Sequence, residues 1–328
     1  MKKFIIIVIS ICLIFTLASC EKKKNDSSSK VEVNELYAAE EISFDFKSET
    51  DLLKKYPKFS NGEAVQFKYD FNAPEYKELL AKYPIAKIAG EGSEFKRAMR
   101  LVVEYAPRLT HESNYDNHVE ENSLDLLKYS LDNPKKGINC RAKSKILNEM
   151  CLALGIYSRR VFISPYSSID SDSHVVNEIY DAVLNKWIMI DMTTDAYFAD
   201  ENGTPLSILE IRQHAIEDKY LAMIKQNEKI EVENDSADSI TYFMKNIFFF
   251  YLYEKQGYGT KGFADGMVYF QPEGFDVKKF SISRIENRLG LLKMNYADKE
   301  TNNNMEKDLK HMKKAKFKIG STDSLIAK

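Results

Sequence analysis

The feature that most constrains the fold is a long helical pattern that is followed by several strand patterns in the middle of the chain. Residues 139–154 predict a helix, and Gly155 follows it where a C-cap glycine is common. The helical spacing of apolar residues predicts earlier helices over 93–106 and 123–131. Strand patterns come next, over residues 160–164, 174–181 and 187–191. Helices that precede an antiparallel sheet predict an α+β fold.

Composition limits the kind of protein. A chain of 328 residues with 44% hydrophobic residues can form one large domain or two small ones around a true core. The formal net charge is −2, from 47 basic and 49 acidic residues, which argues against nucleic acid as the main partner. Four cysteines are too few for a disulfide scaffold in a chain of this length.

The first residues have the pattern of an export signal. Lys2 and Lys3 precede an apolar run over 4–17, which predicts a signal peptide over residues 1–19. The run is too short for a comfortable membrane span, which needs roughly 20 apolar residues. Its end, Leu-Ala-Ser-Cys, resembles a bacterial lipobox, which implies lipidation of Cys20.

The polar composition after Cys20 predicts a flexible tether over residues 20–40. We therefore expect a lipid-anchored protein of the cell membrane or cell envelope that faces out of the cytoplasm. Ordinary secretion with cleavage elsewhere is the alternative, and which membrane would carry the anchor stays open.

The rest of the chain divides into three further parts. We expect the main domain, with an N-terminal extension, over residues 41–225, including a helical stretch near 206–226. Residues 226–297 are rich in aromatic and β-prone positions and predict strands over 240–253 and 266–270 on the same core. The charged tail, 298–328, predicts a surface helix or disorder.

Cys140 and Cys151 remain outside the leader and the lipobox. Cys140 lies at the predicted start of a helix, where unpaired N–H groups and a partial positive charge stabilise a thiolate. Cys151 lies about 16 Å further along that helix axis, beyond disulfide reach of Cys140. We expect Cys151 to be a core thiol.

A cysteine nucleophile needs a base, and the base needs an orienting group. His174 begins a predicted strand and Asp191 ends the next one. If these strands pair antiparallel through a loop centred near Val183, the two side chains come close together. A tight turn at residues 185–186 would instead place Asp191 opposite Tyr180.

Three stretches resemble the transglutaminase-like superfamily of cysteine enzymes. Residues 140–159, CRAKSKILNEMCLALGIYSR, are similar to its cysteine helix, which ends in a Leu-Gly-Ile turn followed by arginine. Residues 174–178, HVVNE, are similar to its histidine strand, and 186–193, KWIMIDMT, to its tryptophan-to-aspartate strand. Val176 replaces a usual tryptophan and Met192 a usual proline, which leaves substrate preference open.

The resemblance implies a papain-like core over about 90–200, with the nucleophile helix packed on an antiparallel sheet, and a triad of Cys140, His174 and Asp191. Such a triad attacks a peptide or protein amide and forms a thioester, which water or an amine then resolves. We expect hydrolysis by a protease or amidase to dominate over amine transfer. The alternative is a surface module that holds a peptide or glycan in the same cleft without turnover.

The oxyanion of the intermediate needs donors as well. The backbone N–H of Cys140 is the expected donor, and the adjacent Asn139 is a candidate for a second one.

Two other patterns resemble binding motifs but do not fit them. His111 and His118 do not match a zinc spacing, and the letters GxGxxG over 257–262 lack the following helix of a dinucleotide site. We therefore expect neither metal nor cofactor, and the sequence does not indicate an oligomeric state.

Overall fold

The computed structural model describes residues 45–226, 228–232, 238–261, 266–294 and 299–328. The predicted signal peptide, Cys20 and the tether over 20–40 lie outside these residues. Contacts between backbone positions group residues 44–328 into one unit. No helix within the described ranges combines the length and the apolar character that a bilayer span requires.

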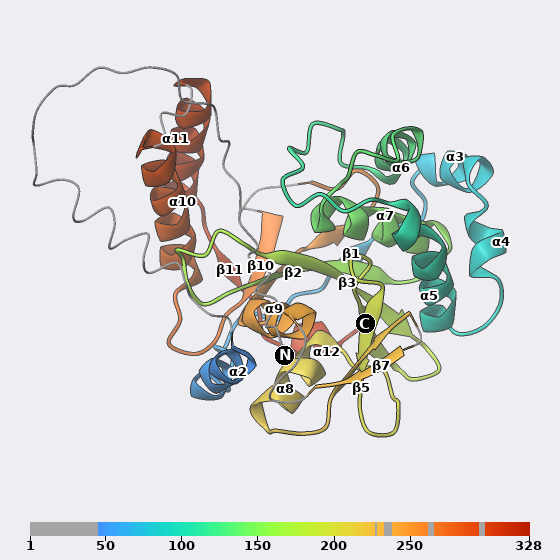
Figure 1. Cartoon of the computed structure of the whole chain (residues 1–328), viewed down its shortest axis with the longest axis horizontal. Coiled ribbons are helices and arrows are strands. Elements are labelled where there is room, and N and C mark those ends of the chain that lie inside the picture. Colours follow the sequence, from blue (N-terminus) through green and yellow to red (C-terminus); the bar gives the residue numbers. More distant parts are fainter. Residues whose placement is uncertain (1–44, 227, 233–237, 262–265, 295–298) are drawn as a thin grey trace, which may run out of the picture. The chain divides into compact units, whose positions relative to one another are not determined.

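A six-stranded sheet forms the centre, in the order β11-β10-β8-β2-β3-β4 (Figure 1). Every neighbouring pair is antiparallel except β10 and β11, which run parallel. The antiparallel sheet and the α+β class are therefore confirmed. The strands are β2 (Ser158–Ser164), β3 (His174–Asp181), β4 (Lys186–Ile190), β8 (Phe249–Tyr253), β10 (Met267–Phe270) and β11 (Lys318–Ile319).

One group of helices packs around α7 (Cys140–Ala153), which contacts β2 and β3 directly. Every residue of α7 from 142 to 152 is buried, although lysine and glutamate are among them. The helices share one apolar cluster with α7, which fixes the helix against the sheet. They are α3 (Glu75–Lys82), α4 (Ile85–Ala89), α5 (Glu94–Tyr105), the 3-10 helix η1 (Ala106–Arg108) and α6 (Ser123–Asp132).

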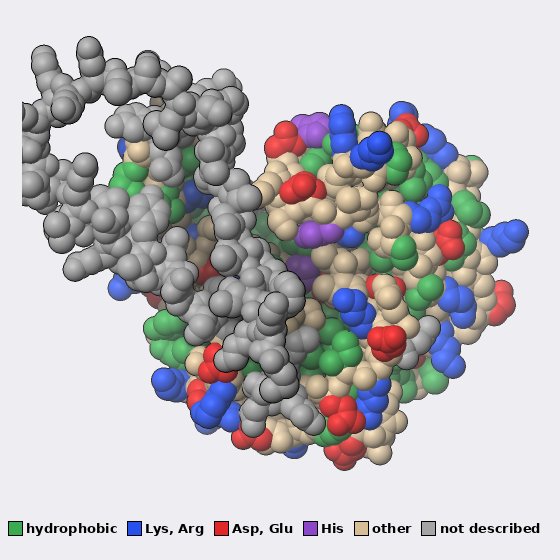
Figure 2. Space-filling view, viewed as in Figure 1, with side chains coloured by type: hydrophobic (Ala, Val, Ile, Leu, Met, Phe, Trp, Pro, Cys, Tyr) green, Lys and Arg blue, Asp and Glu red, His purple; other side chains and the backbone are tan. Residues whose placement is uncertain are grey.

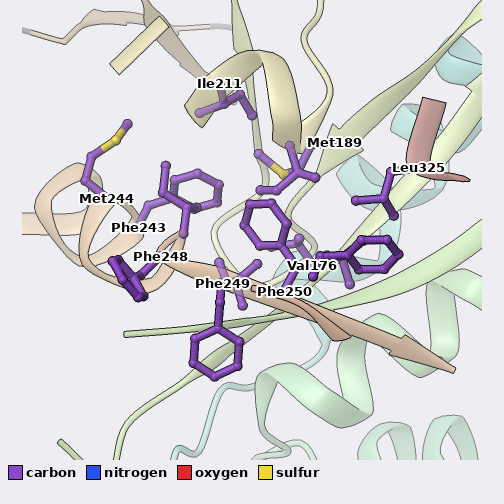
Figure 3. Packing of buried hydrophobic residues seen from close by; sticks show 14 of the residues in the cluster. Val176, Met189, Ile211, Phe243, Met244, Phe248, Phe249, Phe250 and Leu325 are labelled. Carbon is purple, nitrogen blue, oxygen red and sulfur yellow. The ribbon is translucent and has the colours of Figure 1, made fainter. Parts of the chain in front are cut away.

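A second apolar cluster joins the sheet to α8 (Ile208–Ile216) and α9 (Asp238–Asn246). Figure 3 shows part of it, with Val176 and Met189 from the sheet close to Phe243 and Ile211 from the helices. Helix α2 (Phe46–Lys55) packs against both of these helices. The sheet thus contributes to two separate hydrophobic clusters.

Smaller elements complete the fold. A three-stranded sheet contains β5 (Ala196–Ala199), β6 (Ala222–Lys225) and β7 (Glu228–Glu231), and β1 (Lys68–Tyr69) pairs with β9 (Lys255–Gln256). Helices α10 (Val277–Met294) and α11 (Lys299–Lys314) pack on each other. The short helix α12 (Asp323–Ile326) lies near the C-terminus.

A strand was predicted over residues 240–253, and the structure contradicts this for the first half of that range. Residues 238–246 form the helix α9, because Ile240, Phe243 and Met244 follow the spacing of a helical face and are all buried. A helix was predicted near residues 206–226, but the helix ends at Ile216. Residues 222–225 form the strand β6 instead. Helices α2, α3 and α4 were not predicted, whereas the charged tail does contain a helix, α11.

A buried ion pair joins β2 to β3. Arg159 and Glu178 are cross-strand neighbours, and the guanidinium donates from Nε (2.9 Å) and Nη2 (2.7 Å) to Oε2 of Glu178. Glu178 Oε1 accepts the backbone N–H of Ile208, and Arg159 lies 3.9 Å from the ring centre of Trp187. The pair thus ties both strands to α8 and β4.

We expect Arg159→Met to lower the free energy of unfolding by about 3–5 kcal/mol, because it leaves the Glu178 carboxylate buried and unpaired. Urea denaturation followed by circular dichroism measures this. The double variant Arg159→Met/Glu178→Gln should recover much of the loss, since it removes the charge as well. A single variant as stable as the native protein would contradict this account.

Candidate active site

The start of α7 is fixed by a loop that runs beside it. Ile138 forms a parallel bridge with His111, and its N–H donates to the carbonyl of Thr110 at 3.0 Å. Gly137 permits this approach, because a Cβ at that position would lie 2.4 Å from the Cβ of Glu112. The chain before Cys140 is therefore held in place by backbone contacts.

Asn139 is the N-cap of α7, and its Oδ1 accepts the N–H of Ala142 at 3.1 Å. The backbone carbonyl of Asn139 accepts the N–H of Lys143. The N–H groups of Cys140 and Arg141 belong to the first turn and have no acceptor within the helix. Cys140 itself is half-buried, so its thiol lies at the edge of the packed interior.

The connection between β3 and β4 determines where Asp191 lies. Asp181 pairs with Lys186, so the loop contains residues 182–185 and is centred near Val183, as one of the two predicted alternatives requires. Asn177 pairs with Ile190, the last residue of β4. One further step along this register brings Asp191 level with residue 176, beside His174.

His174 and Asp191 form a buried hydrogen-bonded pair. Nε2 of His174 lies 2.8 Å from Oδ2 of Asp191, and each residue is only 4% exposed. Asp191 also accepts the hydroxyl of Thr194 on Oδ2 and the backbone N–H of Thr193 on Oδ1, both at 2.8 Å. Burial raises the pKa of Asp191, but the charge of His174 and these hydrogen bonds outweigh burial and lower it.

The same contacts shift His174 in the opposite direction. Burial lowers the pKa of His174, but attraction to Asp191, the hydrogen bond with Asp191 and the charge of Cys140 raise it well above its ordinary value. Because Nε2 faces Asp191, Nδ1 is the ring nitrogen left for the thiol of Cys140. The structure thus pairs His174 with Asp191 and places Cys140 near enough for its charge to act on the imidazole.

Aromatic side chains surround His174, Asp191 and Cys140. The ring of Tyr242, from α9, packs edge-on against the His174 ring with centroids 5.6 Å apart. A small pocket beside His174 and Asp191 is lined by Phe198, Phe243 and other mainly apolar side chains. Next to Cys140 lie aromatic residues of the sheet, Phe162, Tyr251 and Tyr253. The histidine and the carboxylate are therefore shielded from bulk water.

An ion-pair network holds the residue after Cys140. Glu121 accepts from Arg141 Nε at 3.1 Å and from Arg160 Nη1 at 2.6 Å. Burial raises the pKa of Glu121, but the two guanidinium groups outweigh it and lower the pKa to about 2. Glu121 therefore stays ionised and keeps the first turn of α7 fixed to β2.

The structure does not support Asn139 as an oxyanion donor. Its side-chain Nδ2 donates to the carbonyl of Tyr115 and to Oδ1 of Asn117, at 3.4 and 3.2 Å, while Oδ1 caps the helix. Both ends of this amide are engaged, so we assign Asn139 a capping role instead.

Cys151 lies in the core, as expected. It is fully buried, and burial raises the pKa of its thiol to about 12. The two cysteines of the described part, Cys140 and Cys151, are both free thiols.

Figure 2 shows histidine side chains close together on one face of the molecule. His118 pairs with Asp116 and contacts Tyr129, while His111 contacts Ser113. No group of three metal-ligating side chains occurs among the residues that the structure describes.

Sequence reasoning missed Thr193, Thr194 and Tyr242. The Thr193 N–H closes an Asx turn on Asp191, and the sequence Asp-x-Thr is a signal for such a turn. Tyr242 was missed because its segment was predicted as a strand, and nothing in the local sequence relates it to His174.

Comparison with known proteins identifies the class of this domain. Residues 85–192 match the model of the transglutaminase-like superfamily, so the chain carries a transglutaminase-like domain, and the resemblance inferred over about 90–200 is confirmed. A domain of this class indicates a cysteine-type enzyme. No curated protein matches the chain.

Among solved structures, the chain is similar to one described as a "Putative Cysteine Protease" from Cytophaga hutchinsonii. The identity is 14% and the TM-score 0.31, and the match covers 51% of this chain. It spans 59% of the length of that structure.

The His174–Asp191 pair predicts a pH-dependent stability. A lowered Asp191 pKa contributes above the ordinary value of 3.8, and a raised His174 pKa contributes fully below the ordinary value of 6.5. We expect the stability lost in Asp191→Asn to be greatest between these values. The loss should shrink as the pH rises through the raised His174 pKa. Denaturation at a series of pH values tests this, with Asp308→Asn on the exposed face of α11 as a control. A pH-independent difference would contradict it.

Proposed function

We propose that the protein is a lipid-anchored, extracytoplasmic cysteine enzyme that hydrolyses amide bonds of peptides or proteins. The observation that carries the proposal is the buried hydrogen bond between His174 and Asp191, with the half-buried Cys140 close enough for its charge to act on the imidazole. The class of the domain supports the same chemistry.

In the first half of the reaction, the sulfur of Cys140 attacks the carbonyl carbon of the scissile amide. His174 receives the thiol proton on Nδ1 and passes it to the nitrogen of the leaving amine. The C–N bond then breaks, the amine departs and a thioester remains on Cys140. Asp191 orients the ring through Nε2 and stabilises the imidazolium, and Thr193 and Thr194 orient Asp191 in turn.

In the second half, water attacks the thioester and gives a proton to His174. The C–S bond breaks, the acid is released and the thiol takes its proton back. The negative oxygen of each tetrahedral intermediate needs donors, and we assign these to the backbone N–H groups of Cys140 and Arg141. Both groups lie at the N-terminus of α7, where the helix dipole also favours negative charge.

Hydrolysis is favoured over transfer to an amine because Cys140 is partly open to solvent. Water at its bulk concentration then competes for the thioester.

We expect Cys140→Ala to lower turnover of a peptide mixture at least about a thousandfold, because it removes the nucleophile. Mass spectrometry detects new peptide termini, and an added dansylated amine reports transfer. Cys151→Ala is the matched control and should keep activity, since that thiol is buried away from the site. Ligand binding without new termini or label would favour a non-catalytic binding module.

The anchor is tested separately, because it depends on residues 1–40. We expect Cys20→Ser to abolish incorporation of radiolabelled palmitate and to move the protein from the membrane fraction to the soluble fraction. Cys12→Ser is the matched control, since Cys12 would be removed with the leader. Lipidation would be disproved if the native protein carried no palmitate label and entered the aqueous phase when a detergent solution separates into two phases.

A further inference from the structure

The helix pair α10 and α11 concentrates positive charge. Residues 277–314 contain ten basic and five acidic residues, a formal net charge of +5, in a chain whose total is −2. The rest of the chain therefore carries a formal charge of −7. Charge that is separated in this way creates a local potential, which attracts an oppositely charged surface.

This helix pair lies largely outside the packed interior. Val277 and Phe280, in the first turn of α10, belong to the apolar cluster of the sheet, and α10 then packs along α11 (Figure 1). No residue of α11 from 301 to 314 is buried. The core thus holds the start of α10, while α11 is open to solvent along the length that the structure describes.

One face of α11 carries a basic stripe, formed by Lys307, Lys310 and Lys314. These lysines follow the i, i+3, i+7 spacing of a single helical face, and all three are exposed. Among the described residues, none forms an ion pair with them. The stripe therefore keeps its charge available to a partner outside the chain.

The other side of α11 faces α10. Met305, Leu309 and Met312 share the face opposite the basic stripe and are half-buried. Two ion pairs cross between the helices, Lys293–Glu306 and Lys313–Glu286. The basic stripe is therefore on the side of α11 that is turned away from α10.

The end of α10 exposes apolar side chains close to this charge. Leu291 and Leu292 are only half-buried, and Met294 is 47% exposed. A lysine-rich face next to exposed apolar residues is typical of segments that lie in the interface of a membrane, where lysines contact headgroups and apolar side chains reach the acyl chains.

We propose that the α10–α11 pair docks on a bilayer of anionic phospholipids, with the basic stripe on the headgroups and the apolar end of α10 in the interface. Nucleic acid also attracts lysines, but the exposed Leu291, Leu292 and Met294 favour a surface with hydrocarbon beneath its charges. The contact goes beyond the proposed hydrolysis, because it uses no residue of the active site. A lipid on Cys20 would raise the local concentration of the bilayer and so favour the docked state.

Lysine labelling of the full-length protein tests the docking. The N-hydroxysuccinimide ester of acetic acid acylates an exposed Nζ, which forms an amide as N-hydroxysuccinimide leaves, and mass spectrometry gives the rate at each lysine. The vesicles contain phosphatidylcholine alone or a mixture with phosphatidylglycerol, and neither lipid has a reactive amine. We expect the mixed vesicles to slow the labelling of Lys307, Lys310 and Lys314 by about fivefold.

The same sample contains matched controls. Lys77, Lys82 and Lys87 are exposed on α3 and α4 and should react at equal rates with both kinds of vesicle. Since salt screens contacts between exposed charges, 1 M sodium chloride should restore the labelling of the basic stripe. Equal labelling of the stripe with both kinds of vesicle, or equal slowing of the control lysines, would overturn the proposal. Stronger slowing by duplex DNA than by the mixed vesicles would assign the stripe to nucleic acid and would also overturn it.

A pair of variants tests the apolar end of α10. Met294→Ser removes an exposed apolar side chain and should weaken the slowing of the stripe by the mixed vesicles. Val103→Ser is the matched control, because Val103 is 50% exposed on α5. Full slowing in Met294→Ser would overturn the insertion of the apolar end and with it the choice of a bilayer. None of these measurements uses the reactivity of Cys140, so a failure of the proposed hydrolysis would leave them unchanged.

Discussion

The antiparallel register of β3 and β4 is the constraint on which the site depends. Side chains alternate between the two faces of a sheet, so a shift of one residue would turn Asp191 away from His174. The loop over 182–185 prevents this shift. Asp181 accepts the N–H groups of Val183 and Leu184, and its other oxygen accepts the N–H of Phe95 on α5. A turn remote from the chemistry thus determines the distance between histidine and carboxylate.

Charge is buried throughout the interior next to this register, and almost all of it is compensated. Glu149 pairs with Lys145 and accepts the N–H of Ser123 and of Gly259, so a single carboxylate joins α7, α6 and a distant loop. Such pairs add little net stability, but they penalise any arrangement that separates the partners. They suit a site in which Cys140 must meet His174 at hydrogen-bond distance.

The helix of Cys140 and the strands of His174 and Asp191 could be predicted because their signals are local. A turn, a capping residue and Gly155 delimit α7, and apolar strand patterns bounded by turns delimit β3 and β4. The α9 segment could not be predicted as easily, because Phe and Tyr favour strands while the buried spacing is helical.

The contact between Tyr242 and His174 has a consequence for how the domain can be separated from the chain. The family match ends at residue 192, yet the ring against the imidazole comes from α9, about fifty residues later. The opposite end of the sheet depends on still later residues, because the Trp187 indole donates to the carbonyl of Ala327 and Arg159 to that of Leu325. A fragment cut at the family boundary would keep the triad residues but expose their apolar surroundings to water. The part of the chain that must fold together to keep the site intact is therefore longer than the segment that matches the family.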